Sequence, residues 1–248
     1  MVRPEYEGPP QQYYGKETAA SYDQNTRIID VQQSIASRCI QLLEIAQNSF
    51  LLDIGCGSGW SGSVISASGH QWLGVDISMD MLELAKNKGD NFDIFKCDIG
   101  MGLPFTPGTF DGVISVSVLQ WLFHSYSTEE NPITRIRRFM QDLFSVMKRN
   151  SKAVLQFYPE SKKQIDILKT EAKRAGFDGG LVIDDEGTKN VKYYLLLECG
   201  GEREIIKEKK VRLGRREKIF KKKEALRQKG VEVARNSKYS GRKRTGKF

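Results

Sequence analysis

The sequence predicts an α/β protein, a doubly wound and mostly parallel sheet with helices on both faces. Three observations support this fold class. Apolar strand-like runs alternate with helical patterns, the first run ends in a glycine-rich turn, and the last two runs have no helix between them. Strands that alternate with helices form parallel pairs with right-handed crossovers. The 248 residues are enough for one such domain and a C-terminal extension.

The first strand and its turn are the most informative stretch. Residues 49–59 read Ser-Phe-Leu-Leu-Asp-Ile-Gly-Cys-Gly-Ser-Gly, between a helix expected at 27–47 and one starting near Trp60. Glycine tolerates positive φ and has no Cβ, and the first amides of a helix are free. Such a turn lets the backbone approach a phosphate or nucleoside closely, so this stretch predicts a nucleotide pocket.

Three interpretations of the glycine run compete. Gly57 to Gly62 matches the loose dinucleotide pattern G-x-G-x-x-G, and a purely structural turn is also conceivable. However, the run opens at Gly55, directly after the strand, and Asp53 lies within the strand, where a dinucleotide site needs no acid. The block from Asp53 to Gly59 resembles motif I of the class I S-adenosylmethionine-dependent methyltransferases. The resemblance implies that the acid faces the cofactor's ammonium group and that the glycine loop passes under the cofactor.

The next two strands also end in acids. Residues 71–76 end in Asp76, whose carboxylate can accept hydrogen bonds from both ribose hydroxyls. Residues 92–99 include Asp98, which stands where members of the family contact the adenine amino group. The full set predicted to bind the cofactor is Tyr14, Asp53, Gly55, Cys56, Gly57, Ser58, Gly59, Asp76, Ile77, Met81, Asp98, Ile99 and Val116.

The remaining elements complete the alternation. A helix is expected to begin near Ser78. Further strands are expected at 110–116 and 153–157, each followed by a helix, at 133–148 and 161–175. A closing hairpin is expected from the strands 180–183 and 191–199. The hairpin brings the sheet to seven strands. It distinguishes a Rossmann-like methyltransferase sheet from a dehydrogenase sheet.

The acceptor side of the site is expected after the fourth strand, at residues 115–121, because ligands of such sheets bind outside the carboxyl ends of the strands. Two boxes are absent there: the Asn/Asp-Pro-Pro-aromatic box of exocyclic-amine methylation and the Pro-Cys of pyrimidine-carbon methylation. A ring nitrogen such as guanine N7 needs no prior deprotonation. We therefore predict positioning roles for Gln120, at a base edge, and Trp121, as a stacking platform, with core packing as the alternative for Trp121.

Histidines and N-terminal tyrosines complete the candidates. His70 is expected on a surface loop and His124 at the rim of the pocket. Tyr13, Tyr14 and Tyr22 precede the first long helix in a polar, proline-flanked segment. These tyrosines are expected to form a lid.

Several blocks extend the resemblance over nearly the whole chain, to the eukaryotic small-subunit (18S) ribosomal RNA guanine-N7 methyltransferases. They are Arg3-Pro4-Glu5-Tyr6, Pro9-Pro10, Tyr13-Tyr14, Asn25-Thr26-Arg27-Ile28-Ile29, Gly74-Val75-Asp76-Ile77-Ser78, Ser115 to Leu122, Gln156-Phe157-Tyr158-Pro159 and Gly241-Arg242-Lys243-Arg244. One departure lies between Lys221 and Arg244, where the basic character is sparse.

The resemblance implies a substrate, a partner and a location. Members methylate one guanine of 18S rRNA, take part in small-subunit assembly on the pre-40S particle, and form a heterodimer with a small zinc-binding activator protein. Their location is the nucleus and nucleolus, with the cytoplasm as a further site. In this fold the third strand is a sheet edge, and an exposed edge invites strand addition. We expect the activator to dock on Asn91 to Cys97.

Charge divides the chain sharply. Residues 1–202 carry 20 Lys and Arg against 26 Asp and Glu, a net charge of −6, whereas residues 203–248 carry 19 against 5, a net charge of +14. We therefore predict a catalytic domain over 1–202 and a flexible basic tail over 203–248. The tail either binds RNA phosphates or, through Arg242-Lys243-Arg244, directs nuclear import.

Two other functions fit parts of the sequence. A small-molecule methyltransferase would use the same cofactor turn but would not need the basic tail. A cofactor-binding assembly factor would act mainly as a scaffold. The four cysteines lie far apart, which indicates a reducing compartment and no metal site, and no apolar run is long enough to span a membrane. We expect a soluble, intracellular protein.

Overall fold

The computed structural model describes residues 3–88, 93–127, 130–188 and 190–200, with short pieces at 220, 222–223, 226–227 and 233–235. The chain divides into two compact units, Met1–Ile206 and Lys207–Phe248, and the first contains the sheet. The predicted boundary after residue 202, most of the basic tail and its Arg242-Lys243-Arg244 block lie outside the described residues.

The elements of the first unit follow the predicted alternation. They are η1 (Pro4–Tyr6), α1 (Pro10–Tyr13), α2 (Lys16–Gln24), α3 (Thr26–Leu43), β1 (Phe50–Ile54), α4 (Trp60–Ala67), β2 (Gln71–Asp76), α5 (Met79–Asn87), β3 (Asp93–Lys96), η2 (Ile99–Met101), β4 (Phe110–Val116), η3 (Leu119–Phe123), α6 (Pro132–Val146), β5 (Met147–Phe157), α7 (Lys162–Ala175), β6 (Phe177–Asp184) and β7 (Lys192–Cys199).

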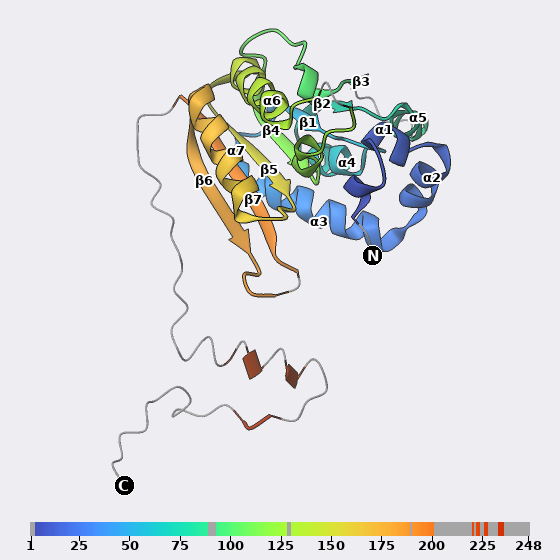
Figure 1. The fold of residues 1–248 in the computed structure, drawn as a ribbon, viewed down its shortest axis with the longest axis vertical. Coiled ribbons are helices and arrows are strands. Elements are labelled where there is room, and N and C mark those ends of the chain that lie inside the picture. The colour runs from blue at the N-terminus through green and yellow to red at the C-terminus, as the bar shows by residue number, and fades with distance from the viewer. Residues whose placement is uncertain are drawn as a thin grey trace. The chain divides into compact units, whose positions relative to one another are not determined.

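The strands form one seven-stranded sheet in the order β3-β2-β1-β4-β5-β7-β6 (Figure 1). The first five strands are parallel, and β7 lies antiparallel between β5 and β6. The predicted fold class, with its closing hairpin and its edge position for the third strand, is confirmed. Several boundaries differ from the prediction. The strand β5 begins at Met147 rather than at residue 153, β6 begins at Phe177 rather than at residue 180, β3 is confined to Asp93–Lys96, and α3 ends at Leu43 rather than at residue 47.

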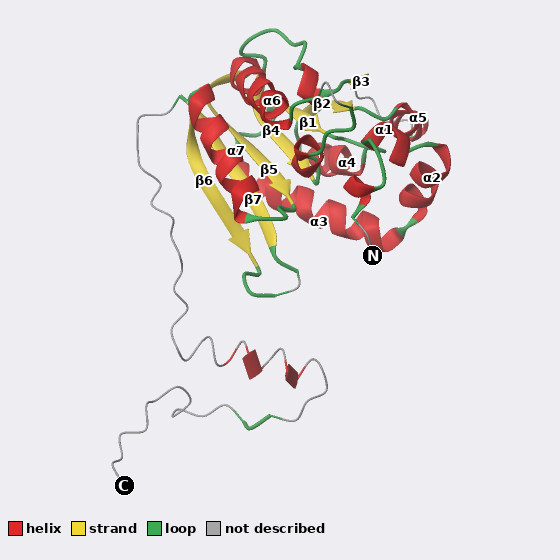
Figure 2. Ribbon diagram, in the orientation of Figure 1, coloured by secondary structure: helices red, strands yellow, loops and turns green. Residues whose placement is uncertain are grey.

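Helices cover both faces of the sheet (Figure 2). One hydrophobic cluster joins the sheet to α6 and α7, and a second joins it to α3, α4 and α5. Neighbouring residues of β1 show why the strand begins with three apolar residues in a row, since Leu52 belongs to the first cluster and Leu51 to the second. A parallel strand buried on both faces reads as an unbroken apolar run.

Local signals set the helix ends. The side chain of Asn25 accepts a hydrogen bond from the Ile28 amide at the start of α3, and Ser78 caps α5 through the Met81 amide. Gly176 ends α7 with a φ of 110°. No helix in the part of the chain that the structure describes combines the length and apolarity needed to cross a bilayer.

His70 lies in the turn between α4 and β2, as predicted, but not on the surface. The side chain is 7% exposed, and its amide donates to the Ile65 carbonyl at the end of α4. The surface prediction was therefore wrong. The connection between α4 and β2 is short and packs between this helix and the sheet, so its residues have little room to reach solvent.

Candidate functional site

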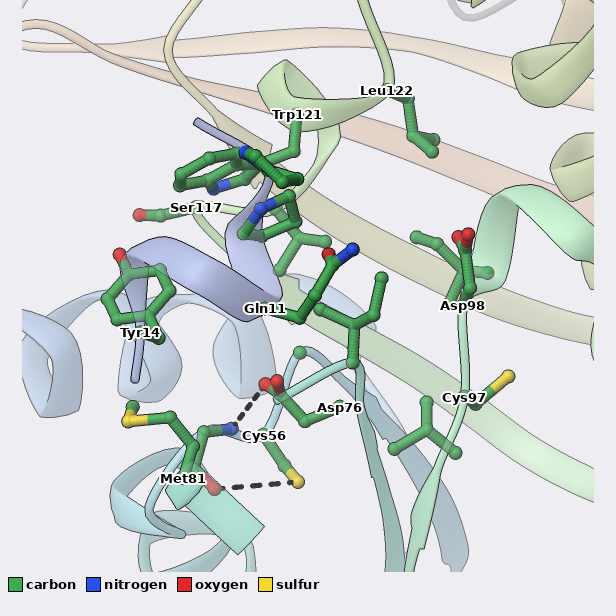
Figure 3. Close-up of a pocket in the computed structure, with 18 of the residues that line it drawn as sticks. Gln11, Tyr14, Cys56, Asp76, Met81, Cys97, Asp98, Ser117, Trp121 and Leu122 are labelled. Carbon is green, nitrogen blue, oxygen red and sulfur yellow. Dashed lines mark hydrogen bonds between the residues drawn. The ribbon is translucent and has the colours of Figure 1, made fainter. Parts of the chain in front are cut away.

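A cavity of about 350 Å³ lies beyond the carboxyl ends of β1 to β4. The sheet reverses its strand order here, because β1 pairs with both β2 and β4, and open α/β sheets bind ligands at this switch point. Of the predicted site residues, those that line the cavity are Tyr14, Gly55, Cys56, Gly57, Ser58, Asp76, Ile77, Met81, Asp98, Ile99, Val116 and Trp121 (Figure 3). Asp53, Gly59 and Gln120 do not line it.

The glycine turn takes a conformation that favours glycine. Gly55 has a φ of 72° and Gly57 a φ of 53°. A Cβ on Gly55 would lie 2.1 Å from a methyl carbon of Val118, and one on Gly57 would lie 3.0 Å from the Met81 methyl. The loop that begins after β1 therefore touches the segment that follows β4, and a side chain on either glycine would disturb the cavity wall.

Asp76 at the end of β2 is held in a fixed orientation. One carboxylate oxygen accepts a hydrogen bond from the Gly57 amide over 2.9 Å (Figure 3), and the other accepts one from the Ser78 amide, also over 2.9 Å. Burial raises the pKa of Asp76, and these amides together with that of Ile77 oppose the rise. The carboxylate keeps unused lone pairs on the cavity side, as a contact to a diol requires.

Asp53 lies behind the cavity wall rather than in it. Its side chain is fully buried, and Oδ2 accepts a hydrogen bond of 2.6 Å from Ser61, which does line the cavity. Oδ1 has no hydrogen-bond partner among the described residues. Burial raises the pKa of Asp53 to about 7, helped by the nearby charge of Asp76 and opposed by Ser61. An orphaned buried oxygen beside the glycine turn fits a site for a cationic group.

Asp98 is paired with Arg135, a residue of α6 that the sequence did not single out. One guanidinium nitrogen lies 2.8 and 3.1 Å from the two Asp98 oxygens, and another lies 3.2 Å from Glu130. Gly100 makes room for this arrangement, because a Cβ there would lie 2.3 Å from Arg135. Asp98 also accepts the Gly100 amide at 2.9 Å, so its carboxylate is oriented at the edge of the cavity.

The N-terminal segment covers the cavity, as the lid prediction requires. Pro9, Pro10, Gln11, Gln12, Tyr14 and Tyr22 line it, whereas Tyr13 of the predicted lid does not. The Ser78 hydroxyl donates to the Tyr14 carbonyl over 2.8 Å, which ties α1 to the start of α5. Burial raises the pKa of Tyr22 to about 12 and that of Tyr14 further, so both phenols are neutral.

A cluster of three side chains, Asp23, Trp60 and Lys88, fastens α2 to the glycine turn. Lys88 donates to the Asp23 carboxylate and to the Ser58 carbonyl, each over 2.7 Å, and its ammonium lies 3.7 Å from the centre of the Trp60 ring. Trp60 Nε1 donates to the same Asp23 oxygen over 2.7 Å. We call this cluster the latch, because it joins the lid helix to the cofactor loop.

Aromatic rings form the other end of the cavity. The Trp121 ring lies 6.1 Å from that of Tyr13 and 5.9 Å from that of Tyr14, and Tyr14 packs edge-to-face against Tyr22. Trp121 is 8% exposed, so it is a packed residue that also presents surface to the cavity. The arrangement suits the stacking of a flat, apolar ring system.

The other predicted acceptor residues lie beside this end. The Gln120 side chain donates to the Ser117 carbonyl over 2.8 Å, and the base-edge role proposed for it stays a prediction. His124 packs on Tyr6 and Tyr126 and does not line the cavity; its Nε2 lies 3.4 Å from Glu160.

Two family models match the chain. One described as "Methyltransferase domain" covers residues 52–155, and one described as "Methyltransferase involved in Williams-Beuren syndrome" covers residues 160–246. The first spans the strands that build the cavity. The second covers the closing part of the sheet and the basic tail.

Curated relatives match over their full length. The 18S rRNA (guanine-N(7))-methyltransferase of Schizosaccharomyces pombe is 41% identical over 100% of both chains, and that of Mus musculus is 39% identical over 99% of this chain and 98% of its own. The 18S rRNA (guanine(1575)-N(7))-methyltransferase of Saccharomyces cerevisiae is 38% identical over 100% of both.

Solved structures with the same fold are more distant in sequence. An S-adenosylmethionine-dependent methyltransferase of Methanococcus maripaludis has a TM-score of 0.60 at 15% identity, covering 77% of this chain and 96% of its own. A Haloferax volcanii methyltransferase in complex with the Trm112 methyltransferase activator has a TM-score of 0.53 at 14% identity, covering 74% and 98%. These likenesses establish the fold.

Proposed function

Because the chain belongs to the family of 18S rRNA (guanine-N7)-methyltransferases, we propose that its cavity transfers a methyl group from S-adenosylmethionine to N7 of a guanine in 18S rRNA. The observation that carries the proposal is the meeting of two loops in one cavity. The glycine turn after β1 forms one end, the aromatic group after β4 forms the other, and Gly55 touches Val118 between them.

The donor end has the groups that a sulfonium nucleoside needs. Asp76 would accept the ribose hydroxyls, oriented Asp98 would accept the adenine amino group, and the orphaned Asp53 oxygen would balance the cationic amino-acid end across Ser61. S-adenosylmethionine would supply a methyl group carried on a positively charged sulfur. The sulfur would keep the electron pair of the broken carbon–sulfur bond and leave as a neutral thioether.

The reaction at N7 needs no group that removes a proton. The N7 lone pair of guanine forms the new nitrogen–carbon bond, and the positive charge passes from sulfur to the base. The protein contributes alignment and exclusion of water, through Trp121 and the tyrosines of the lid. A flipped-out guanine stacked on these rings would meet the donor end-on.

Mapping N7-methylguanine in 18S rRNA tests the function. Cells that carry the wild-type protein should show the modification, and cells with Gly57→Ala should lose it, because Gly57 has a positive φ and a Cβ there meets Met81. Gly180→Ala is the matched control, since a Cβ at that position meets nothing within 4 Å. An unchanged map in cells without the protein would overturn the proposal.

The same Gly57→Ala cells distinguish the catalytic function from the scaffold alternative. If subunit assembly continues at the normal rate in the Gly57→Ala cells while methylation is lost, assembly depends on the presence of the protein and not on methyl transfer. If assembly stops together with methylation, the two are coupled.

We further infer that the activator binds the β3 edge. Phe95 of this strand is 51% exposed although it lies in the sheet, and β3 pairs only with β2 among the described strands. The Haloferax volcanii methyltransferase of the same fold was solved with an activator, which supports such a partner here. Asn91 and Phe92 of the predicted docking strand lie outside the described residues.

Two aspartate substitutions test this docking surface. Phe95→Asp should prevent heterodimer formation with a small zinc-binding activator on size-exclusion chromatography, because an edge charge blocks strand addition. Ile183→Asp places the same charge on β6, the opposite edge, at a residue 37% exposed, and should leave the heterodimer intact. Equal hydrogen exchange of residues 93–97 with and without the activator would also contradict the inference.

We place the protein in the nucleus and nucleolus, on the pre-40S particle. The support is its rRNA substrate and the +14 tail, which suits both RNA phosphates and nuclear import. A fluorescent protein fused to residues 203–248 should concentrate in the nucleus. A uniform distribution would leave the tail with RNA binding as its role.

A further inference from the structure

Ser117, directly after β4, has a backbone conformation that serine rarely adopts. Its φ is 61°, in the left-handed region, where a non-glycine residue is strained. The residue lines the cavity and is half-buried. Strain of this kind persists only where the surroundings hold it in place, and it is concentrated at functional sites.

Three hydrogen bonds hold Ser117 in this conformation. Its amide donates to the Gln156 carbonyl over 3.0 Å, its carbonyl accepts from the Gln120 side chain over 2.8 Å, and its hydroxyl donates to Gln156 Oε1 over 2.9 Å. Backbone and side chain are thus both fixed. An ordinary turn does not need these three hydrogen bonds. We therefore read them as fixing the position of the Ser117 hydroxyl.

Gln156 is the residue that orients the hydroxyl. It lies near the end of β5, its side chain has no exposure, and its Nε2 has no hydrogen-bond partner among the described residues. A buried amide that uses one of its groups on Ser117 and leaves the other unused costs stability. Burial raises the pKa of Tyr158, and the polar side chains of Ser117 and Gln156 oppose the rise, so the phenol lies close to this pair.

The cluster faces the acceptor end of the cavity. In Figure 3 the Ser117 hydroxyl projects beneath the Trp121 ring, on the side of Tyr14. Because the proton of this hydroxyl goes to Gln156, its oxygen keeps lone pairs that can accept an N–H group. Guanine carries such donors at N1 and at its exocyclic amino group.

We propose that Ser117 contacts the target guanine through its hydroxyl oxygen and that Gln156 is the positioning residue that orients this hydroxyl. The inference rests on the proposed function and adds to it a recognition element for the acceptor base. Trp121 provides a surface on which any base can stack, whereas a fixed hydrogen-bonding oxygen selects among bases.

The test uses Ser117→Gly in the full chain, because glycine suits a φ of 61° and the change removes only the small hydroxymethyl group. With unmodified 18S rRNA as substrate, kcat/KM should fall roughly 3- to 10-fold, the loss of one hydrogen bond, while the Kd for S-adenosylmethionine is unchanged. Asn150→Gly is the matched control. Asn150 is an exposed residue with a φ of 64°, and its replacement should leave kcat/KM unchanged.

Gln156→Met separates positioning from packing. If Gln156 acts through Ser117, this variant should lose the same factor in kcat/KM, and the Ser117→Gly/Gln156→Met double variant should be no worse than either alone. Multiplying losses would overturn the positioning role. Normal kcat/KM for Ser117→Gly would overturn the contact itself, whereas the proposed function fails only if the wild-type protein leaves 18S rRNA unmethylated.

Discussion

At the scale of single residues, the site depends on carboxylates whose surroundings differ. Asp76 is satisfied by backbone amides, Asp98 is paired with Arg135, and Asp53 is buried with one oxygen unused. Three acids that occupy similar positions at three strand ends are thus prepared for three different contacts. Their separate environments predict separate responses to substitution.

Asp76→Ala should weaken S-adenosylmethionine binding by roughly 10- to 100-fold, because the variant loses charged hydrogen-bond acceptors for the ribose and releases the Gly57 amide. Isothermal titration calorimetry measures the change. Asp166→Ala, at an exposed position of α7, is the control and should bind like the wild type. Equal affinities of the two variants would remove Asp76 from the binding site.

Asp53→Asn should change how stability depends on pH. The unfolded carboxyl loses its proton near pH 4, whereas the buried one has a pKa of about 7. Between these values the native state holds the proton more tightly, so the wild type loses stability as pH rises through this window and no further above it. Asparagine has no such loss.

Thermal melts of the two cofactor-free proteins from pH 4 to pH 9 check this prediction. The stability of Asp53→Asn relative to the wild type should rise up to about pH 7 and then level off. Parallel curves over the whole range would mean that Asp53 ionises normally in the folded protein.

At the scale of elements, the lid is joined to the cofactor loop by the latch of Asp23, Trp60 and Lys88. The latch uses a charge-assisted hydrogen bond and a cation–π contact, both partly shielded from water. Since α2 covers the cavity through Tyr22, the latch stabilises the closed form of the lid.

Lys88→Met should open the lid more often. We expect S-adenosylmethionine to bind about 3- to 10-fold more weakly, through faster dissociation, because one charge-assisted contact is lost. Stopped-flow displacement measures the dissociation rate. Lys86→Met, at an exposed position two residues earlier at the end of α5, is the control. A dissociation rate as slow as the control's would show that the latch does not hold the lid.

Element boundaries show where sequence patterns are informative. The strands β2 and β4 begin and end at the predicted residues, because apolar runs stop there at an acid or a turn. The start of β5 was missed because residues 148–152 are polar and mostly exposed; Met147 nevertheless pairs with Phe110 across a register shift. Pairing to a neighbour strand leaves no trace in the pattern of the strand itself.

The site was predicted where its residues follow strands and missed where elements far apart in sequence meet. The glycines and acids at or near the ends of β1, β2 and β3 could be predicted directly from the sequence. The Arg135 pair with Asp98 spans 37 residues, and nothing local to α6 distinguishes Arg135 from its basic neighbours. Ser117 was overlooked because its left-handed φ is a property of the folded turn, which glycine or asparagine would have indicated and serine does not.

At the scale of the whole molecule, the charge distribution assigns affinity for RNA and methyl transfer to different parts of the chain. The net charge of −6 over residues 1–202 repels phosphate, and +14 over residues 203–248 attracts it. We expect affinity for rRNA to come mainly from the tail, and choice of the guanine from the cavity.

Deletion of residues 203–248 should therefore weaken RNA association and flatten its salt dependence, with cofactor affinity unchanged. Filter-binding assays over a series of salt concentrations measure the slope. A scrambled tail of the same composition is the control and should restore both affinity and slope, because phosphate contacts carry little sequence information. An unchanged slope after deletion would assign RNA binding to the domain.

The contacts of the N-terminal segment have a consequence for how the protein is made. Arg3 donates to the Tyr158 carbonyl and Tyr6 donates to Glu160, partners that lie 155 and 154 residues further along the chain. Arg3 and Tyr6 are synthesised long before these partners exist. The lid can therefore contact the cofactor loop early, but these two bonds form only after Tyr158 and Glu160 have left the ribosome, when most of the sheet has been synthesised.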